Sequence, residues 1–277
     1  MAITSLNQAI AALGNQKGYL VPFQFNASVT FTGPRFHFYN GFTGLHGQFN
    51  FTGTNLAFTN CNNTTQGGIW TDRPTPASGE NIHLAYWNLC TNSSSNAPAL
   101  FYLVDIIGYY FNISTNTTAT QNLTGTVDLR GYPYAFATFI ASTTTGSTTQ
   151  TMTLSYTNEN NVSGRTSSTL TLTTINTFGF VQRLFACVLQ GADRGMRSVQ
   201  SITFSSANTG AGHLVLFVPI ATLPYYIWNV ATEREFITQL PALPTIRQDA
   251  CLALFAFHGS TASSSAITFG TMQFIVG

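Results

Sequence analysis

Three charged residues stand close together in the segment LQGADRGMRSVQSITFSS, which begins at Leu189. They are Asp193, Arg194 and Arg197, in a chain with only 10 Lys and Arg and 9 Asp and Glu among 277 residues. Glycines around them predict a turn between two strands, where a carboxylate can accept bonds from turn amides or pair with an arginine. We expect an internally bonded structural turn. The alternative is a subunit contact, in which one arginine reaches a neighbouring subunit.

The acidic residues show no catalytic arrangement. A glycosidase needs two carboxylates across a cleft, and no local motif in this chain pairs two of them. Glu233 and Glu235 are interpreted as charges at the start of a helix. The sequence contains no Gly-x-Ser-x-Gly elbow, phosphate loop or dinucleotide fingerprint. We therefore expect no catalytic residues, no cofactor and no enzymatic activity.

Histidines and cysteines lack the spacing of metal ligands. No two histidines stand at ligand spacing on one element, and there is no CxxC motif, so no metal site is predicted. Cys187 and Cys251 lie in apolar segments and are interpreted as small buried hydrophobic residues. Cys61 and Cys90 lie in polar, loop-like sequence, and whether they pair remains open.

The tryptophans are candidate aromatic contacts. Trp70, Trp87 and Trp228 could stack on sugars or contact other subunits. In β-sandwiches, tryptophan more often fills the core or an interface. An exposed Trp70 or Trp87 in a concave site would favour binding to host-surface glycans, whereas a place at subunit contacts would favour assembly.

The composition restricts the partners of the chain. Charged residues make up 7% of it, against about 25% in an ordinary globular domain. Phosphate neutralisation needs clustered Lys and Arg, so we expect no nucleic-acid partner. No segment approaches the ~18 apolar residues of a membrane span, so we expect no membrane partner. Such a surface suits a protein that is packed against neighbours.

Most of the chain has the pattern of β-strands. After residue 100, alternating segments separated by Gly or Asn predict an all-β fold, a β-sandwich of jelly-roll type. The nearly continuous apolar run Leu100–Ile113 predicts a strand buried on both faces or a bent central strand. We also expect a strand at Ile82–Leu89 and a hairpin at Tyr156–Thr166.

A short helix is predicted near the start of the chain. Ser5 and Gln8 have the spacing of a capping box. Leu6, Ile10 and Leu13 fall on one helical face. We expect this stripe to clasp either the chain's own domain or a neighbouring subunit.

A second short helix is predicted as an insertion near residues 232–240. Thr232 and Glu235 again have capping-box spacing, and Pro241 would end the helix. The expected organisation is an N-terminal arm (1–22), a Phe/Gly-rich and loop-rich region (23–99) and a sandwich core (100–277). The last two are expected to form one continuous domain.

Four segments resemble virion structural proteins of tailed bacteriophages. One is the opening MAITSLNQAIAAL, with its Thr-Ser-Leu and short helix. The others are the YTN…SGRT hairpin (Tyr156–Thr166), the LQ-G-D-G-RSVQS-T-S segment (Leu189–Ser205) and the DACLA strand (Asp249–Ala253). Residues 23–98 show no such likeness. In this respect the chain is similar to capsid decoration or cement proteins of the phage head.

The resemblance implies a non-enzymatic capsid decoration protein that binds the outside of the major capsid protein lattice and stabilises the head. Its partners would be the major capsid protein and copies of itself, as a homotrimer. Its location would be the virion, on the head surface, after assembly in the host bacterial cytoplasm. The alternatives are a virion adhesin or carbohydrate-binding module, and another structural protein of the head or tail.

Overall fold

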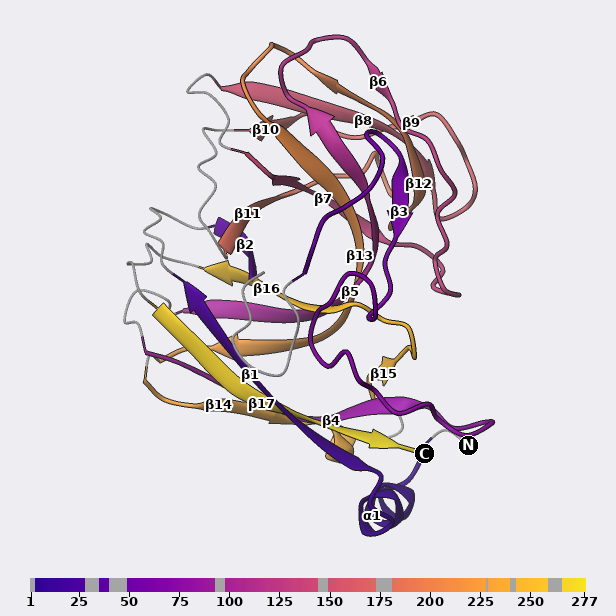
Figure 1. Cartoon of the computed structure of the whole chain (residues 1–277), viewed down its shortest axis with the longest axis vertical. Helices are drawn as coiled ribbons and strands as arrows, with labels where there is room; N and C mark the ends of the chain where they lie inside the picture. Colours follow the sequence, from indigo (N-terminus) through magenta and orange to yellow (C-terminus); the bar gives the residue numbers. More distant parts are fainter. Residues whose placement is uncertain are drawn as a thin grey trace.

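The chain folds into stacked antiparallel β-sheets with a short α-helix at the foot (Figure 1). This computed structural model describes residues 3–27, 35–39, 49–92, 98–143, 149–172, 181–227, 229–239, 243–258 and 266–277. The predicted all-β sandwich with an N-terminal helix is confirmed.

The lower sheet in Figure 1 combines the two ends of the chain. Its strands, in spatial order, are β1 (Gly18–Ala27), β17 (Ala266–Val276), β4 (Ile82–Thr91) and β14 (Thr232–Glu235), and β15 (Thr245–Ile246) also pairs with β4. Strand β4 confirms the strand predicted at this place.

The middle sheet closes on itself. Its strands follow the order β13 (Ala211–Tyr225), β7 (Phe136–Ala141), β11 (Val181–Ala186), β2 (Arg35–Tyr39), β16 (Leu252–His258), β5 (Ala99–Ser114) and β3 (Phe58–Asn60). Because β13 pairs with β5 as well as with β7, the sheet forms a ring with an inside and an outside.

The upper sheet contains the predicted hairpin. Its order is β10 (Leu170–Leu172), β8 (Gln150–Asn158), β12 (Met196–Phe204) and β6 (Gln121–Asn122), and β9 (Arg165–Thr166) pairs with β8. The chain between β8 and β9 forms the hairpin loop, which confirms that prediction.

Strands β5 and β13 form a long ribbon that serves three hydrophobic clusters. Leu103 of β5 packs into the cluster under the lower sheet, Val104 into the cluster inside the ring, and Tyr110 into the cluster under the upper sheet. Three register shifts interrupt the pairing of β5 with β13. Bulges of this kind bend and twist a ribbon, which lets one ribbon face all three clusters. Both faces of β5 are buried, because each of them packs against a hydrophobic cluster. This confirms the prediction of a strand buried on both faces.

Helix α1 (Leu6–Gly14) has the predicted cap, and its apolar stripe is covered by the chain's own domain only in part. Ser5 accepts a bond from the Gln8 amide, and the Gln8 side chain bonds back to the Ser5 amide, which completes the capping box. The helix buries Ala9 and Ala12 against the sheet. Leu6 and Ile10 are 52% and 57% exposed. Small side chains allow close approach to β17, and Leu13 packs against the same cluster, whereas a contact of Leu6 and Ile10 with a neighbouring subunit stays a prediction.

The second predicted helix begins later than expected and is shorter. Thr232 lies in β14, which pairs with β4, and its hydroxyl donates to the Pro224 carbonyl instead of capping a helix. In the part of this insertion that the structure describes (229–239), helical structure is a single 3-10 turn, Ile237–Gln239. Strand pairing with β4 outweighed the local capping pattern, so Glu233 and Glu235 are strand residues and not helix-end charges.

Replacing Gly108 by alanine should destabilise the ribbon. A Cβ at this position would lie 2.4 Å from the Thr59 carbonyl oxygen and 2.5 Å from the Phe58 ring. Because the backbone of β3 cannot move away cheaply, we expect Gly108→Ala to lower the free energy of unfolding by about 1–3 kcal/mol in chemical denaturation. Gly14→Ala is the control, since no atom lies within 4 Å of its added Cβ. Equal stability of the two variants would contradict the close β3–β5 contact.

Candidate functional site

Asp193 is the centre of a compact hydrogen-bond network at one end of the upper sheet. The Tyr156 hydroxyl donates to its Oδ2 at 2.6 Å, and the Asn158 amide donates to its Oδ1 at 3.0 Å. Arg165 donates from Nε and Nη2 to the two carboxylate oxygens at 2.9 and 3.2 Å. The bidentate geometry fixes both groups. We call this set, with Gln190, the Asp193 network.

Gln190 joins the network to the turn. Its backbone amide donates to the Tyr156 hydroxyl at 2.8 Å, and its side-chain carbonyl accepts from the Thr166 amide at 3.1 Å. The hydroxyl of the fully buried Tyr156 therefore donates one hydrogen bond, to Asp193, and accepts one, from Gln190. The network therefore ties the β8–β9 hairpin to the turn before β12.

The network favours the ionised form of Asp193. Hydrogen bonds from Arg165 first, and then from Tyr156 and Asn158, lower the pKa of the Asp193 carboxyl to about 2. The same ion pair raises the pKa of Arg165. An anion held this way is a structural link, because a general base would need a pKa near the working pH.

The three charged residues of this segment have different environments. Asp193 pairs with Arg165 and not with either nearby arginine. The Arg197 guanidinium donates to the Pro133 carbonyl at 3.1 Å. Arg194 is exposed, and its backbone amide donates to Glu159 at 3.2 Å. Of the three candidates, Arg194 is the one whose side chain lies on the surface.

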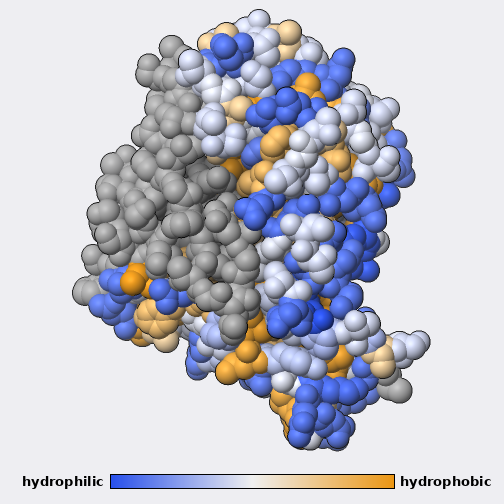
Figure 2. Space-filling model, in the orientation of Figure 1, coloured by the Kyte–Doolittle hydropathy of each residue, from blue (hydrophilic) through white to orange (hydrophobic). Residues whose placement is uncertain are grey.

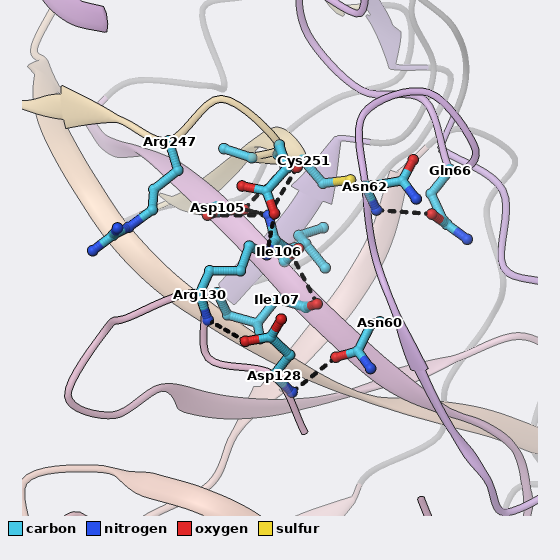
Figure 3. A network of polar contacts seen from close by, with 12 residues as sticks. Asn60, Asn62, Gln66, Asp105, Ile106, Ile107, Asp128, Arg130, Arg247 and Cys251 are labelled. Atoms are coloured by element: carbon cyan, nitrogen blue, oxygen red, sulfur yellow. Dashed lines mark hydrogen bonds and ion pairs between the residues drawn. The ribbon is translucent and has the colours of Figure 1, made fainter. Parts of the chain in front are cut away.

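A second network surrounds Asp105 of β5 (Figure 3). Arg130 donates to both Asp105 oxygens at 3.0 and 3.4 Å. It also donates to the carbonyls of Ile106 and Ile107 at 2.7 and 3.0 Å. The Cys251 amide donates to Asp105 at 3.0 Å. We call this set the Asp105 network.

Arg130 binds β5 at the point where one edge of that strand passes from its pairing with β16 to its pairing with β3. Strand β16 pairs with β5 only as far as Asp105, and the last residue of β3 lies opposite Gly108. In this interval the guanidinium bonds the Ile107 carbonyl, which also accepts from the Cys61 amide, and the Ile106 carbonyl, which would be costly to bury unpaired. Burial raises the pKa of Asp105, and the Arg130 charge opposes the rise. A buried pair with all its bonds made fixes geometry more than it adds stability.

Arg130 of the Asp105 network and a second arginine, Arg73, also bind the segment that leads into β16. Arg130 donates to the Asp249 carbonyl at 2.9 Å. Arg73 donates to the carbonyls of Arg247 and Ala250. Burial lowers the pKa of Arg73 to about 10, so its guanidinium stays charged at neutral pH. Two arginines thus anchor the chain as it enters β16.

The described tryptophans lie in the core. Trp87 is fully buried, and Trp70 is 5% exposed and stacks on Phe274 with ring centroids 4.5 Å apart. Neither residue forms the exposed, concave surface that would favour glycan binding. Trp228 lies outside the described residues, so its role as a contact stays a prediction.

Two surface hollows are candidate binding sites. One, of about 600 Å³, lies on the lower sheet and is lined by Pro22, Asn88, Cys90, Phe269 and neighbours. The other, of about 670 Å³, contains several charged groups. Those groups already have partners: Glu80 pairs with Lys17, the Asp128 side chain accepts the Arg130 amide, and Arg247 covers the Tyr132 ring. Neither hollow presents an arranged acid–base pair.

Two further searches of the described chain were negative. Its His, Cys, Asp and Glu residues form no group of three or more that could share a metal ion. Within the same residues, no helix has the length and apolar character needed to cross a bilayer.

Sequence reasoning missed the partners of both aspartates. Tyr156, Asn158 and Arg165 lie in the predicted hairpin, and nothing in their spacing points to Asp193. For Asp105 the available signal was one acid within an apolar strand, since a buried carboxylate requires a partner. That signal could not identify Arg130, which lies in a loop after β6.

Comparisons with known proteins give no family. No protein-family model matches the chain, and no curated protein matches it. Among solved structures, it is similar to T=1 particles derived from infectious bursal virus, at 10% identity and a TM-score of 0.22, covering 99% of this chain and 83% of that one. The infectious bursal disease virus VP2 subviral particle gives 12% identity and a TM-score of 0.22, covering 93% and 80%. Scores of this size carry no argument about fold or function.

Acid should weaken the Asp193 network. Because the pKa of this carboxyl is depressed to about 2, its stabilisation is complete above the usual value of about 4 and is lost as pH falls through about 2. We expect Asp193→Asn to be less stable than wild type at pH 6 and to lose less stability between pH 4 and 2. Urea denaturation at each pH measures this. Exposed Asp72→Asn is the control, and identical pH profiles for all three proteins would contradict the network.

His213 should make folding sensitive to a different pH range. Its ring is stacked between Phe51 and Phe111, with centroids 4.5 and 5.0 Å away, and its Nδ1 accepts from the Asn112 amide. Burial lowers the pKa of His213 from 6.5 to about 4. The neutral ring is favoured, so stability falls as pH drops from 6.5 to 4, by on the order of 3 kcal/mol.

The His213→Asn variant tests this effect. It removes the titrating ring of His213, so its unfolding free energy should fall less steeply than that of the wild type over that pH range; the remaining slope comes from His83, whose pKa burial also lowers. Denaturation curves at half-unit pH intervals measure the slope. A wild-type slope that survives unchanged in the variant would show that His213 does not cause it.

Proposed function

We propose that this chain is a non-enzymatic structural protein of a virion, which functions by binding other coat subunits. More specifically, we propose a decoration or cement protein on a tailed-phage head, bound to the outside of the major capsid lattice as a homotrimer. The observation that carries the proposal is a charge-poor surface with large exposed apolar side chains.

The exposed apolar residues support contacts with other subunits. Tyr226 and Leu20 are 70% and 69% exposed, and Ile227 is 60% exposed. On the face shown in Figure 2, hydrophobic residues form separate patches among hydrophilic ones, including at the foot where α1 lies. Subunit interfaces are depleted in charge and enriched in aromatic residues, so this surface suits an assembled state.

The segments that resemble phage virion proteins also support the proposal. The hairpin Tyr156–Thr166 and the turn at Asp193 meet in one network, and Asp249–Ala253 is anchored in the other. The opening Thr-Ser-Leu begins the capped helix. All four segments therefore have structural roles, which fits a shared architecture and not a shared catalytic site.

Binding to phage heads tests the proposed function directly. The purified chain should co-sediment with heads that lack it, should saturate at a fixed copy number, and should increase the fraction of heads that survive heating. A glycan array run in parallel tests the adhesin alternative. Failure to bind heads, together with specific glycan binding or saccharide turnover, would contradict the proposal.

Arg194 is the arginine that we propose for a subunit contact. Because its side chain lies on the surface, Arg194→Ala should weaken head binding by about 3–10-fold, as expected for a charge at the rim of an interface, and should leave the unfolding temperature unchanged. Arg197→Ala is the matched control, since that guanidinium is already held by Pro133. Unchanged head binding by Arg194→Ala would place the contact elsewhere.

A further inference from the structure

Two cysteines far apart in sequence meet inside the middle sheet. The Cys61 amide donates to the Ile107 carbonyl at 2.9 Å, and the Ile106 amide donates to the Cys251 carbonyl at 2.9 Å. Both cysteines are thus held on consecutive residues of β5. They are 3% and 0% exposed and belong to the same hydrophobic cluster.

The strand order explains this meeting. Strand β13 runs along one edge of β5, so β16 and β3 share the other edge. Cys251 comes immediately before β16, and Cys61 immediately after β3. The two residues therefore face each other across the short interval between these strands. One residue step along β5 is about 3.3 Å, so bonding to consecutive residues of β5 brings the two backbones close together, as a disulfide with its short Cα separation of ~4–7 Å requires.

The side chains are also directed toward each other. The Cys61 thiol is hydrogen-bonded to Cys251. Figure 3 shows the Cys251 side chain pointing toward the segment that carries Asn62. Arg130 and Arg73 hold the two residues just before Cys251, Asp249 and Ala250, by their carbonyls, so the surrounding network fixes the chain where it enters Cys251.

We propose that Cys61 and Cys251 are a disulfide site, which is reduced during synthesis and oxidised afterwards to lock the Asp249–Ala253 segment to the end of β3. This inference does not depend on the proposed function. The oxidant is a small disulfide, RSSR. The Cys61 thiolate attacks one of its sulfurs and releases RS⁻, which takes up the thiol proton as RSH. The Cys251 thiolate then attacks the Cys61 sulfur and releases the second RSH, so two thiols and RSSR give one protein disulfide and two RSH.

Burial of the two cysteines slows both the formation of the disulfide in the folded protein and its later reduction. It raises the pKa of Cys61, so few thiolates form in the closed fold and oxidation is slow there. The same burial shields the bond from reductants once it has formed. The crosslink closes a loop that runs from Cys61 to Cys251, about two-thirds of the 277-residue chain, and a long loop restricts the unfolded state strongly.

The other cysteines lie elsewhere. Cys90 is on β4 and faces Phe269 of β17 in the register of the lower sheet. Cys187 packs against the cluster under the upper sheet. The pairing of Cys61 with Cys90, which the sequence left open, would therefore require two different layers to come together.

Thiol counting tests the proposal. One sample of the full chain is incubated at pH 8.5 with glutathione disulfide, and a second is refolded in a glutathione redox buffer. Both are then denatured, alkylated with iodoacetamide and analysed by mass spectrometry. We expect two alkylated cysteines, Cys90 and Cys187, and a crosslinked peptide pair containing Cys61 and Cys251. The unfolding temperature should exceed that of the reduced protein by roughly 5 °C or more.

Two variants separate this result from other outcomes. Cys90→Ser should keep the crosslink and the higher unfolding temperature. Cys61→Ser should lose both, with every remaining cysteine alkylated. Alkylation of all four cysteines in both wild-type samples, or a crosslink that involves Cys90, Cys187 or a second chain, would overturn the proposal.

Discussion

Strands β5 and β13 pair along almost their whole lengths, and the three hydrophobic clusters all draw side chains from this ribbon. Below, Leu103 and Leu223 pack under the lower sheet; above, Tyr110 and Leu214 pack under the upper sheet. Residues between them fill the inside of the ring. The outer sheets are thus held to one another through this ribbon. Close contacts along it, such as the one at Gly108, constrain the whole structure.

Two ion pairs use some of the few charges of the chain to connect parts of this framework. Asp105 and Arg130 connect β5 to a loop and to the start of β16, and Asp193 and Arg165 connect a hairpin to a turn. Each carboxylate has bonds from several donors, so its burial is compensated. Charge placed there leaves the exterior to hydroxyl, amide and apolar groups. Such an exterior is suited to permanent contact with neighbouring subunits, which is the basis of the proposed function.

Local patterns in the sequence predicted much of the secondary structure, because strand alternation and the Ser5 capping box depend on nearby residues. They failed where distant pairing decides the outcome. Thr232 has a helix-capping pattern, yet its segment pairs with β4. Asp193 binds Arg165 and not the adjacent arginines, since the hairpin brings that guanidinium across the sheet. Ring closure by β13, and the meeting of Cys61 with Cys251, depend on strand order, which short-range patterns do not encode.

The central claim is that this protein functions by contact with other subunits. An electron cryo-microscopy map of intact particles that contain the chain tests it most directly. The account predicts ordered, symmetry-related copies on the head, with the exposed side chains of Leu20 and Tyr226 covered by neighbouring subunits. Particles that lack the chain, or copies whose apolar surfaces all face solvent, would contradict it.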